Sequence, residues 1–304
     1  MRRPVLPIVF GLATALLGAP GLAVAQSGGG KLLLTGGVSS VDGAAGGGLT
    51  PWAVTGSYAT AGEFGATAFA TRAKTGNYGL WTYGAAVSAW DRVELSVAKQ
   101  DFDTQSNLAP LGLDGLHLKQ DILGVKVRVV GDAVLDSDTL MPQIAIGLEH
   151  KKTHAGALGL TLFGPLGARD SGTDVYVSAT KLLLAQGVLV NLTLRSTKAN
   201  QNGLLGFGGA QSSSAKIQPE LSLAKLLRKD LAIGVEFRAK PDNLNESVLG
   251  AGALKEDDWK DVFVAWAPNK HFSLTAAWVD LGKIAPAVQP KRQTGAYLSA
   301  QFAL

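Results

Sequence analysis

A two-residue alternation of apolar and polar side chains recurs along most of this chain, and it is clearest between residues 231 and 240. Leu231, Ile233, Val235 and Phe237 alternate there with Ala232, Gly234, Glu236, Arg238 and Lys240. An extended strand sends successive side chains to opposite faces, so this run predicts a strand with one apolar and one charged face. Such a strand fits the wall of a barrel that separates lipid from water.

The first 25 residues predict a secretory signal peptide. Arg2 and Arg3 precede an apolar stretch, and the small residues Ala23 to Ala25 form a cleavage site before Gln26. We therefore expect residues 1–25 to be removed and residues 26–304 to form a single outer-membrane barrel. The alternative, a membrane-anchoring helix, is disfavoured because prolines and glycines interrupt the stretch.

The composition narrows the class of protein further. Basic and acidic residues are interspersed, so no nucleic-acid surface is predicted. The absence of cysteine excludes disulfides, thiolate metal sites and haem attachment. Only 17% of the residues are charged, yet the mature chain has no apolar run approaching the ~18 residues of a membrane helix. A closed barrel is the other structure that satisfies its backbone in lipid.

The alternation and its punctuation by glycine, proline, asparagine and aspartate predict an all-β, up-and-down antiparallel transmembrane barrel of about 14 strands. The candidate strands are 31–38, 50–60, 63–73, 78–90, 92–103, 115–130, 138–153, 172–184, 187–199, 213–226, 230–241, 258–267, 271–282 and 292–304. The first is weakened by its glycines, and twelve strands is the alternative if it and a neighbour fail. Short and long gaps alternate between strands, which predicts short periplasmic turns, long external loops and periplasmic termini.

Aromatic residues near the predicted strand ends suggest two girdles at the membrane interfaces. The candidates are Trp52, Trp90, Trp259, Trp266, Phe272, Trp278 and Phe302. The last strand supports the same location, because Leu298, Ala300, Phe302 and Leu304 form an apolar face on an amphipathic C-terminal strand.

Two segments carry a family resemblance: KLLLTGGVSSVDGAAGGGLTPWAV, from Lys31 to Val54, and YGAAVSAWDRVELSVAKQDFDT, from Tyr83 to Thr104. The mature chain resembles a proteobacterial family of predicted outer-membrane proteins known as a domain of unknown function, DUF 3034. The resemblance covers nearly all of residues 31–304. It implies the localisation and brings no activity or catalytic residues.

Polar side chains on the inward parity predict a charged lumen. The candidates are Arg92, Glu94, Lys126, Arg128, Glu149, Lys151, Arg195, Lys216, Glu220, Glu236 and Arg238. Both signs of charge occur on most strands. They fit a water-filled pore for small polar solutes, or a ladder of salt bridges that fills and stiffens the interior.

The predicted external loops are rich in leucine, which fits loops packed over the mouth or a capture site for hydrophobic solutes. The long N-terminal plug domain usual in hydrophobic-solute transporters is expected to be absent, because only about 24 residues precede the second strand.

No residue pattern in the sequence is typical of an active site. The glycine-rich run from Thr35 to Gly48 lacks the lysine of a phosphate-binding loop, and His150 and His154 lack the glutamate of a zinc-protease helix. We therefore predict no catalytic, cofactor-binding or metal-binding residue and no enzyme activity.

These observations predict a bacterial outer-membrane barrel that acts as a passive channel for small solutes. The alternatives are a closed structural or surface-binding barrel, a hydrophobic-solute transporter and a hydrolase at the rim. The expected partners are outer-membrane lipid and lipopolysaccharide, the barrel-assembly machinery and a small solute, with no nucleic acid.

Overall fold

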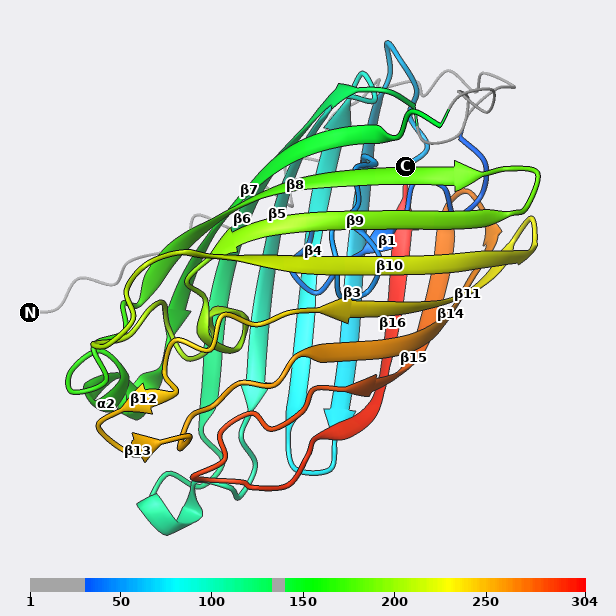
Figure 1. Cartoon of the computed structure of the whole chain (residues 1–304). Helices are drawn as coiled ribbons and strands as arrows, with labels where there is room; N and C mark the ends of the chain where they lie inside the picture. The colour runs from blue at the N-terminus through cyan, green and yellow to red at the C-terminus, as the bar shows by residue number, and fades with distance from the viewer. Residues whose placement is uncertain (1–30, 133–139) are drawn as a thin grey trace, which may run out of the picture. The chain divides into compact units, whose positions relative to one another are not determined.

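Twelve long strands form one closed antiparallel barrel in the computed structural model, which describes residues 31–132 and 140–304 (Figure 1). The predicted signal peptide lies outside the described residues. The wall strands are β3 (Phe64–Thr75), β4 (Gly79–Ala89), β5 (Val93–Asp103), β6 (His117–Val130), β7 (Gln143–His154), β8 (Ser171–Leu183), β9 (Val188–Thr197), β10 (Lys216–Arg228), β11 (Leu231–Arg238), β14 (Trp259–Asn269), β15 (Phe272–Asp280) and β16 (Thr294–Ala303). Consecutive wall strands pair, and β16 pairs with β3 to close the barrel.

The predicted fold class is confirmed, with twelve strands rather than fourteen. The two candidate strands that fail are 31–38 and 50–60, both of which precede β3 and lie outside the wall. Twelve is also an even number, as expected of a single-chain bacterial barrel.

The wall strands have two faces, and β11 shows this most clearly. Ile233 and Val235 are 39% and 47% exposed, whereas Glu236 and Arg238 are each 3% exposed. The exposed side chains are aliphatic and the buried ones are charged, so the apolar face points out of the barrel and the charged face points in. This inside-out arrangement is typical of a wall surrounded by lipid.

The two ends of the barrel differ in the length of their connections. At the short-turn end lie most of the tight turns, the start of β3 and the end of β16. At the long-loop end lie the connections 104–116, 155–170, 198–215, 239–258 and 281–293, which contain η1 (Ala109–Leu111), η2 (Gly156–Leu158), α2 (Gly159–Leu162), η3 (Asn200–Gly203), β12 (Glu246–Ser247) and β13 (Gly250–Ala251). Within the described residues, no helix is long and apolar enough to cross a membrane.

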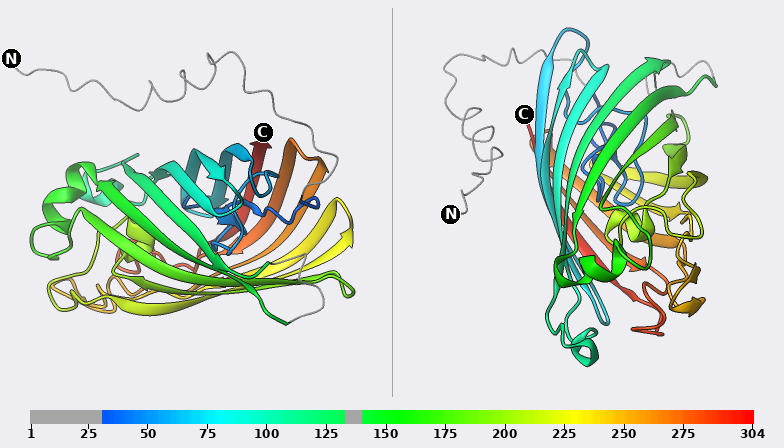
Figure 2. Two further views of the ribbon diagram at one scale, coloured as in Figure 1. Left: turned by 90° about the horizontal axis from the view of Figure 1, so that it is seen from above. Right: turned by 90° about the vertical axis from the view of Figure 1, so that its left-hand side faces the viewer.

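Residues 31–60 lie inside the barrel, and we call this segment the plug. It contains a small hairpin of β1 (Val38–Ser39) and β2 (Ala45–Gly46). Figure 2 shows the segment, in blue, enclosed by the curved wall. Between residues 34 and 59 every residue is buried except Gly48 and Tyr58, which are partly exposed. The N-terminal segment thus fills the lumen, as a short segment and not as the long plug domain of hydrophobic-solute transporters.

Candidate functional site

Side chains of the wall bind the backbone of the plug. Gln143 donates its Nε2 hydrogen to the carbonyl oxygen of Ala53 at 2.7 Å, and Gln100 donates in the same way to Val41 at 2.7 Å. Buried backbone groups need such partners, because an unpaired one costs about as much as a lost hydrogen bond. Most of the plug has no sheet neighbour, so the wall supplies the partners that a strand would otherwise provide.

Two inward carboxylates hold the plug at separate points. Glu94 accepts hydrogen bonds from the backbone N–H groups of Ala45 at 3.0 Å and Gly56 at 2.6 Å. It also forms an ion pair with Lys126 at 3.0 Å, while Lys126 donates to the carbonyl oxygen of Ala45. Charge-assisted hydrogen bonds of this kind are stronger than neutral ones.

Glu236 is the second of these carboxylates. It accepts hydrogen bonds from the backbone N–H of Leu49 and the hydroxyl of Thr50, both at 2.7 Å, and from Ser222 at 2.8 Å. Ser222 also accepts a hydrogen bond from the indole N–H of Trp52 at 2.9 Å. The residues from Leu49 to Trp52 are thereby fixed against β10 and β11.

Two glycines of the plug approach side chains of the wall closely. A Cβ atom on Gly47 would lie 2.0 Å from Oε1 of Glu236, and one on Gly48 would lie 1.8 Å from the hydroxyl oxygen of Tyr297. Real Cβ atoms are not found this close to other heavy atoms. A side chain at either position would require the wall residue to move.

Asp42 is the charged residue through which the plug joins the polar interior, and it is the only charged residue between Leu32 and Gly62. Its carboxylate lies 2.8 Å from Nη1 of Arg238, 3.2 Å from Nζ of Lys151 and 3.9 Å from Nη2 of Arg195. It is only 1% exposed. Burial by itself would raise the pKa of Asp42, but the nearby cations Arg238, Lys151 and Arg195 outweigh burial and hold this pKa well below its ordinary value.

Further carboxylates of the wall complete this ion network. Arg195 lies 2.6 Å from both Glu149 and Glu220, and Lys151 lies 3.3 Å from Asp174. The guanidinium of Arg195 also lies over the ring of Tyr176, 5.0 Å from its centre. A buried charge without a partner is very costly, so each cation here has several anionic neighbours.

The loop between β9 and β10 reaches into the lumen and meets the plug. Asn202, at the turn η3, donates its Nδ2 hydrogen to Asp42 at 2.6 Å. Its side-chain oxygen accepts hydrogen bonds from Lys151 at 2.9 Å and Arg238 at 2.8 Å. The same network therefore joins the wall, the plug and a loop from the long-loop end.

The apolar loop residues pack on one another above this network. The cluster consists of Tyr78, Phe102, Leu118, Ala155, Leu162, Leu166, Leu204, Leu244, Leu254 and Ile284. These side chains come from five connections and the adjoining strand ends. Leucines from three of the predicted external loops thus pack together at the long-loop end of the barrel.

A lysine and a glutamate of the connection 239–258 have displaced pKa values. Burial lowers the pKa of Lys240 to about 7, opposed by Glu256, and burial raises the pKa of Glu256 to about 7, opposed by Lys240. Nζ of Lys240 lies 3.3 Å from the ring centre of Trp259. Glu256 accepts a hydrogen bond from the backbone N–H of Gln201 at 2.8 Å, and so touches the turn that carries Asn202.

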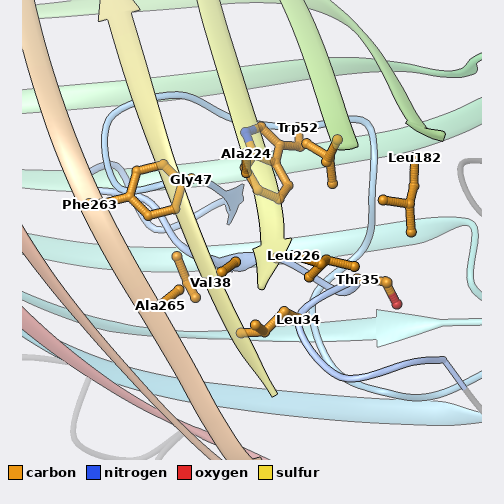
Figure 3. Close-up of a pocket in the computed structure, with 13 residues that line it drawn as sticks. Leu34, Thr35, Val38, Gly47, Trp52, Leu182, Ala224, Leu226, Phe263 and Ala265 are labelled. Atoms are coloured by element: carbon orange, nitrogen blue, oxygen red, sulfur yellow. The ribbon is translucent and has the colours of Figure 1, made fainter. Parts of the chain in front are cut away.

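An apolar cavity of about 30 Å³ lies between the plug and the wall toward the short-turn end (Figure 3). Its lining includes Leu34, Val38 and Trp52 of the plug and Leu182 and Phe263 of the wall. A volume this small holds one or two water-sized molecules. The described conformation thus contains no cavity of solute size at this place.

The predicted lumen residues fall into two groups. Glu94, Lys126, Glu149, Lys151, Arg195, Glu220, Glu236 and Arg238 are buried inside the barrel and contact the plug or one another. The remaining three lie at the ends of the barrel. The prediction that Arg92 lines the lumen is wrong, because Arg92 is exposed in the turn before β5. Arg128 pairs with Asp91 at 2.6 Å near the short-turn end, and Lys216 donates to the carbonyl oxygen of Pro241 at the long-loop end.

The predicted aromatic girdle also divides. Trp90, Trp266, Trp278 and Phe302 are 40–60% exposed on the outer face, and Phe272 is partly exposed, with its ring centre 5.2 Å from that of Phe302. The prediction that Trp52 and Trp259 belong to the girdle is wrong, because each is 5% exposed and lies in the lumen. An indole packs equally well on the inner and outer sides of the wall, so residue type does not distinguish them.

Sequence reasoning missed Asp42, Asn202, Glu256 and Asp174. One signal was available for Asp42, which is a single charge within a long uncharged and glycine-rich run. Asn202 had no comparable signal. Within the described ranges, no group of three or more histidine, aspartate or glutamate side chains is placed to hold a metal ion.

The closed wall and the charged interior define a β-barrel of the outer-membrane type. The chain belongs to the family described as Protein of unknown function (DUF3034), whose model matches residues 35–301. The predicted family is thereby confirmed. No curated protein matches the sequence.

The chain is similar to several solved structures at low sequence identity. The NanC porin has a TM-score of 0.50 and 6% identity, over 79% of this chain and 100% of that one. The KdgM porin in complex with disordered oligogalacturonate has a TM-score of 0.48 and 9% identity, over 78% and 98% of the two chains. The outer membrane phospholipase A from Escherichia coli has a TM-score of 0.41 and 8% identity, over 79% and 92%. The first of these matches supports the fold alone.

Proposed function

We propose that this protein is a plugged channel of the bacterial outer membrane, closed in the described conformation by residues 31–60 and opened when the plug leaves its seat. The observation that carries the proposal is the contact of Asp42 with Arg238 and Lys151 in the interior of the barrel. An open pore for passive diffusion needs a continuous aqueous path. In the described residues that path is occupied by the chain itself.

The lining of the lumen indicates the class of solute. If the plug leaves, it uncovers carboxylates, basic side chains and hydroxyls on the inward face, among them Glu94, Lys126, Glu236 and Arg238. Rows of opposite charge favour small polar solutes over apolar ones. The nearly neutral mixture gives no preference for cations or anions.

The outer face supports the membrane location. Leu95 and Val97 of β5, Leu123 and Val125 of β6 and Leu148 of β7 are 39–57% exposed. Toward the long-loop end this face becomes charged. A band of exposed aliphatic side chains that ends in polar residues is typical of a barrel embedded in a bilayer.

A reversible cross-link tests the proposal. The hydroxyl oxygens of Thr50 in the plug and Ser222 in β10 lie 2.5 Å apart, so the two side chains point toward one another and a Thr50→Cys, Ser222→Cys pair is the cross-link to test. The control pair is Thr71→Cys, Ser299→Cys. These hydroxyls lie 2.7 Å apart on β3 and β16, so this disulfide joins the wall to itself.

We expect the plug pair to give no conductance steps in a planar bilayer when oxidised and to conduct after reduction, in the wild-type or the Asp42→Asn background. The control pair should conduct in both states. Equal conductance of the plug pair before and after reduction would show that conduction does not require plug movement. Silence in every state, with an intact heat-modifiable barrel on gels, would favour the closed structural barrel.

A rim hydrolase has no support from Ser178 and Ser96, which stand on the polar parity of their strands. Ser178 and Ser96 are 0% and 4% exposed and face the lumen. Ser178 bonds with Thr193 at 2.7 Å and with the carbonyl oxygen of Pro51 at 3.3 Å, and not with a histidine.

A further inference from the structure

We propose that the loop between β9 and β10, residues 198–215, is an external latch that holds the plug closed, so that an event at the outer surface releases the plug by lifting this loop. This inference rests on the proposed function and names how the same site is regulated. It stands on the contacts of Asn202, the backbone of η3 and the path of the loop.

Asn202 has contacts that few other side chains could make. Its amide group donates to the carboxylate of Asp42, and its oxygen accepts from Lys151 and Arg238. It therefore binds an anion and two cations at once, and it is 2% exposed. An aspartate there would repel Asp42, and an apolar residue would leave three charged groups with one partner fewer.

The turn that carries Asn202 has an uncommon backbone. Gln201 and Asn202 have φ values of 45° and 60°, in the left-handed region that disfavours residues other than glycine. Neighbouring segments hold this conformation. Gln201 donates its backbone N–H to Glu256 and its side-chain N–H to the carbonyl oxygen of Ile284, at 2.8 and 2.9 Å, and the carbonyl oxygen of Gly203 accepts from Thr153 at 2.6 Å. Such backbone strain persists only where surrounding contacts hold it, and it is concentrated at functional sites.

The path of the loop connects the outer surface to the plug. Its residues 213–215 are exposed, whereas residues 200–204 are buried. Among the described residues, the other charged or hydrogen-bonding side chains on Asp42 belong to Lys151, Arg195 and Arg238, which are fixed in the wall. Asn202 is the partner of Asp42 that belongs to a loop. A movement at the outer surface can therefore reach Asp42 through this loop without deforming the barrel.

The test uses a cysteine in the plug as a reporter. Ser40 is fully buried and its hydroxyl has no hydrogen-bond partner in the described structure, so Ser40→Cys should be tolerated and should react slowly with maleimide while the plug is seated. A protease recognition sequence inserted between Ser213 and Ser214 allows the loop to be cut from outside in intact full-length protein. The control is the same insertion after Gly112, in the connection 104–116.

We expect cleavage at 213–214 to raise the maleimide labelling rate of the reporter about tenfold or more, and cleavage after Gly112 to leave it unchanged. Asn202→Gly, which suits the positive φ and removes the side chain, should raise the rate without cleavage. Complete cleavage at 213–214 with no change in labelling would overturn the latch. Increased labelling in a protein that never conducts would keep the latch and refute the channel.

Discussion

Replacing Asp42 with asparagine is the sharpest single test of the seated plug. The substitution keeps the size of the side chain and removes the only charge that the plug contributes to the interior network. Three ion pairs are lost at once, those with Arg238, Lys151 and Arg195. Removing one partner from a buried ion pair costs about 3 to 5 kcal/mol.

The lower end of this range applies here, because the cations keep other anionic partners. After the substitution, Glu149, Asp174 and Glu220 still surround Arg195 and Lys151, and the asparagine oxygen can still accept a hydrogen bond. We therefore take about 3 kcal/mol as the loss of seating free energy. If opening requires these contacts to break, the open population should rise about 100-fold, at ~1.4 kcal/mol per tenfold.

The assay is the open probability of single channels in a planar bilayer, together with maleimide labelling of the Ser40→Cys reporter. Lys31→Gln is the matched control, because Lys31 is the other charged residue of the plug and pairs with Asp91 at 2.7 Å where both are partly exposed. Its loss leaves the ion network around Asp42 intact, so open probability and labelling should rise much less than in Asp42→Asn. Equal open probability and labelling in Asp42→Asn and the wild type, with the barrel intact, would refute the seating role of Asp42.

Three further predictions concern the fit, the wall and the pH response. Gly48→Ala should unseat the plug and raise reporter labelling, because the added Cβ overlaps Tyr297. Val235→Arg should lower the free energy of unfolding in vesicles by about 2 to 4 kcal/mol near the bilayer midplane, whereas Glu236→Gln should act mainly on plug seating. Glu256 has a raised pKa, so its contribution to the free energy of unfolding falls as the pH rises from 4.5 to about 7. Lys240 has a lowered pKa, so its contribution to the free energy of unfolding falls as the pH drops from 10.5 to about 7. Limited proteolysis of residues 239–258 should therefore be fastest near pH 7.

Controls distinguish these effects from general damage to the barrel. Gly76→Ala adds a Cβ with no atom within 4 Å and should leave labelling unchanged. Equal unfolding free energies for Val235→Arg and the wild type would contradict the lipid-facing assignment. Glu256→Gln should remove the acid limb of the pH profile, and a profile that it does not alter would contradict the role given to this pair.

The wall could be predicted from the sequence because its signal is local. Period-two alternation in β11 depends only on the pleat of the strand, and the length of each connection can be read directly. The terminal strand was readable for the same reason: Leu298 and Phe302 are exposed, while Ser299 and Gln301 are buried. Each of these inferences needs no knowledge of which strands meet across the barrel.

The plug could not be predicted because its environment is assembled from distant residues. Leu34 and Trp52 are apolar, as lipid-facing residues would be, but they pack on Leu182 and Phe263 inside the barrel. Glu94 accepts hydrogen bonds from the backbone of the plug, and no local sequence pattern predicts which residues donate them. Hydropathy indicates that a side chain is removed from water, but it does not distinguish contact with lipid from burial inside the protein.

The covalent link between residue 60 and β3 determines how the plug would behave once released. Only three residues separate them, and β3 begins at the short-turn end. A displaced plug stays tethered beside its own entrance, so return to the seat is intramolecular and its rate is independent of protein concentration. Short flexible tethers give effective concentrations of about millimolar, which favours rapid reseating. Each opening would then be brief and would end without any second molecule.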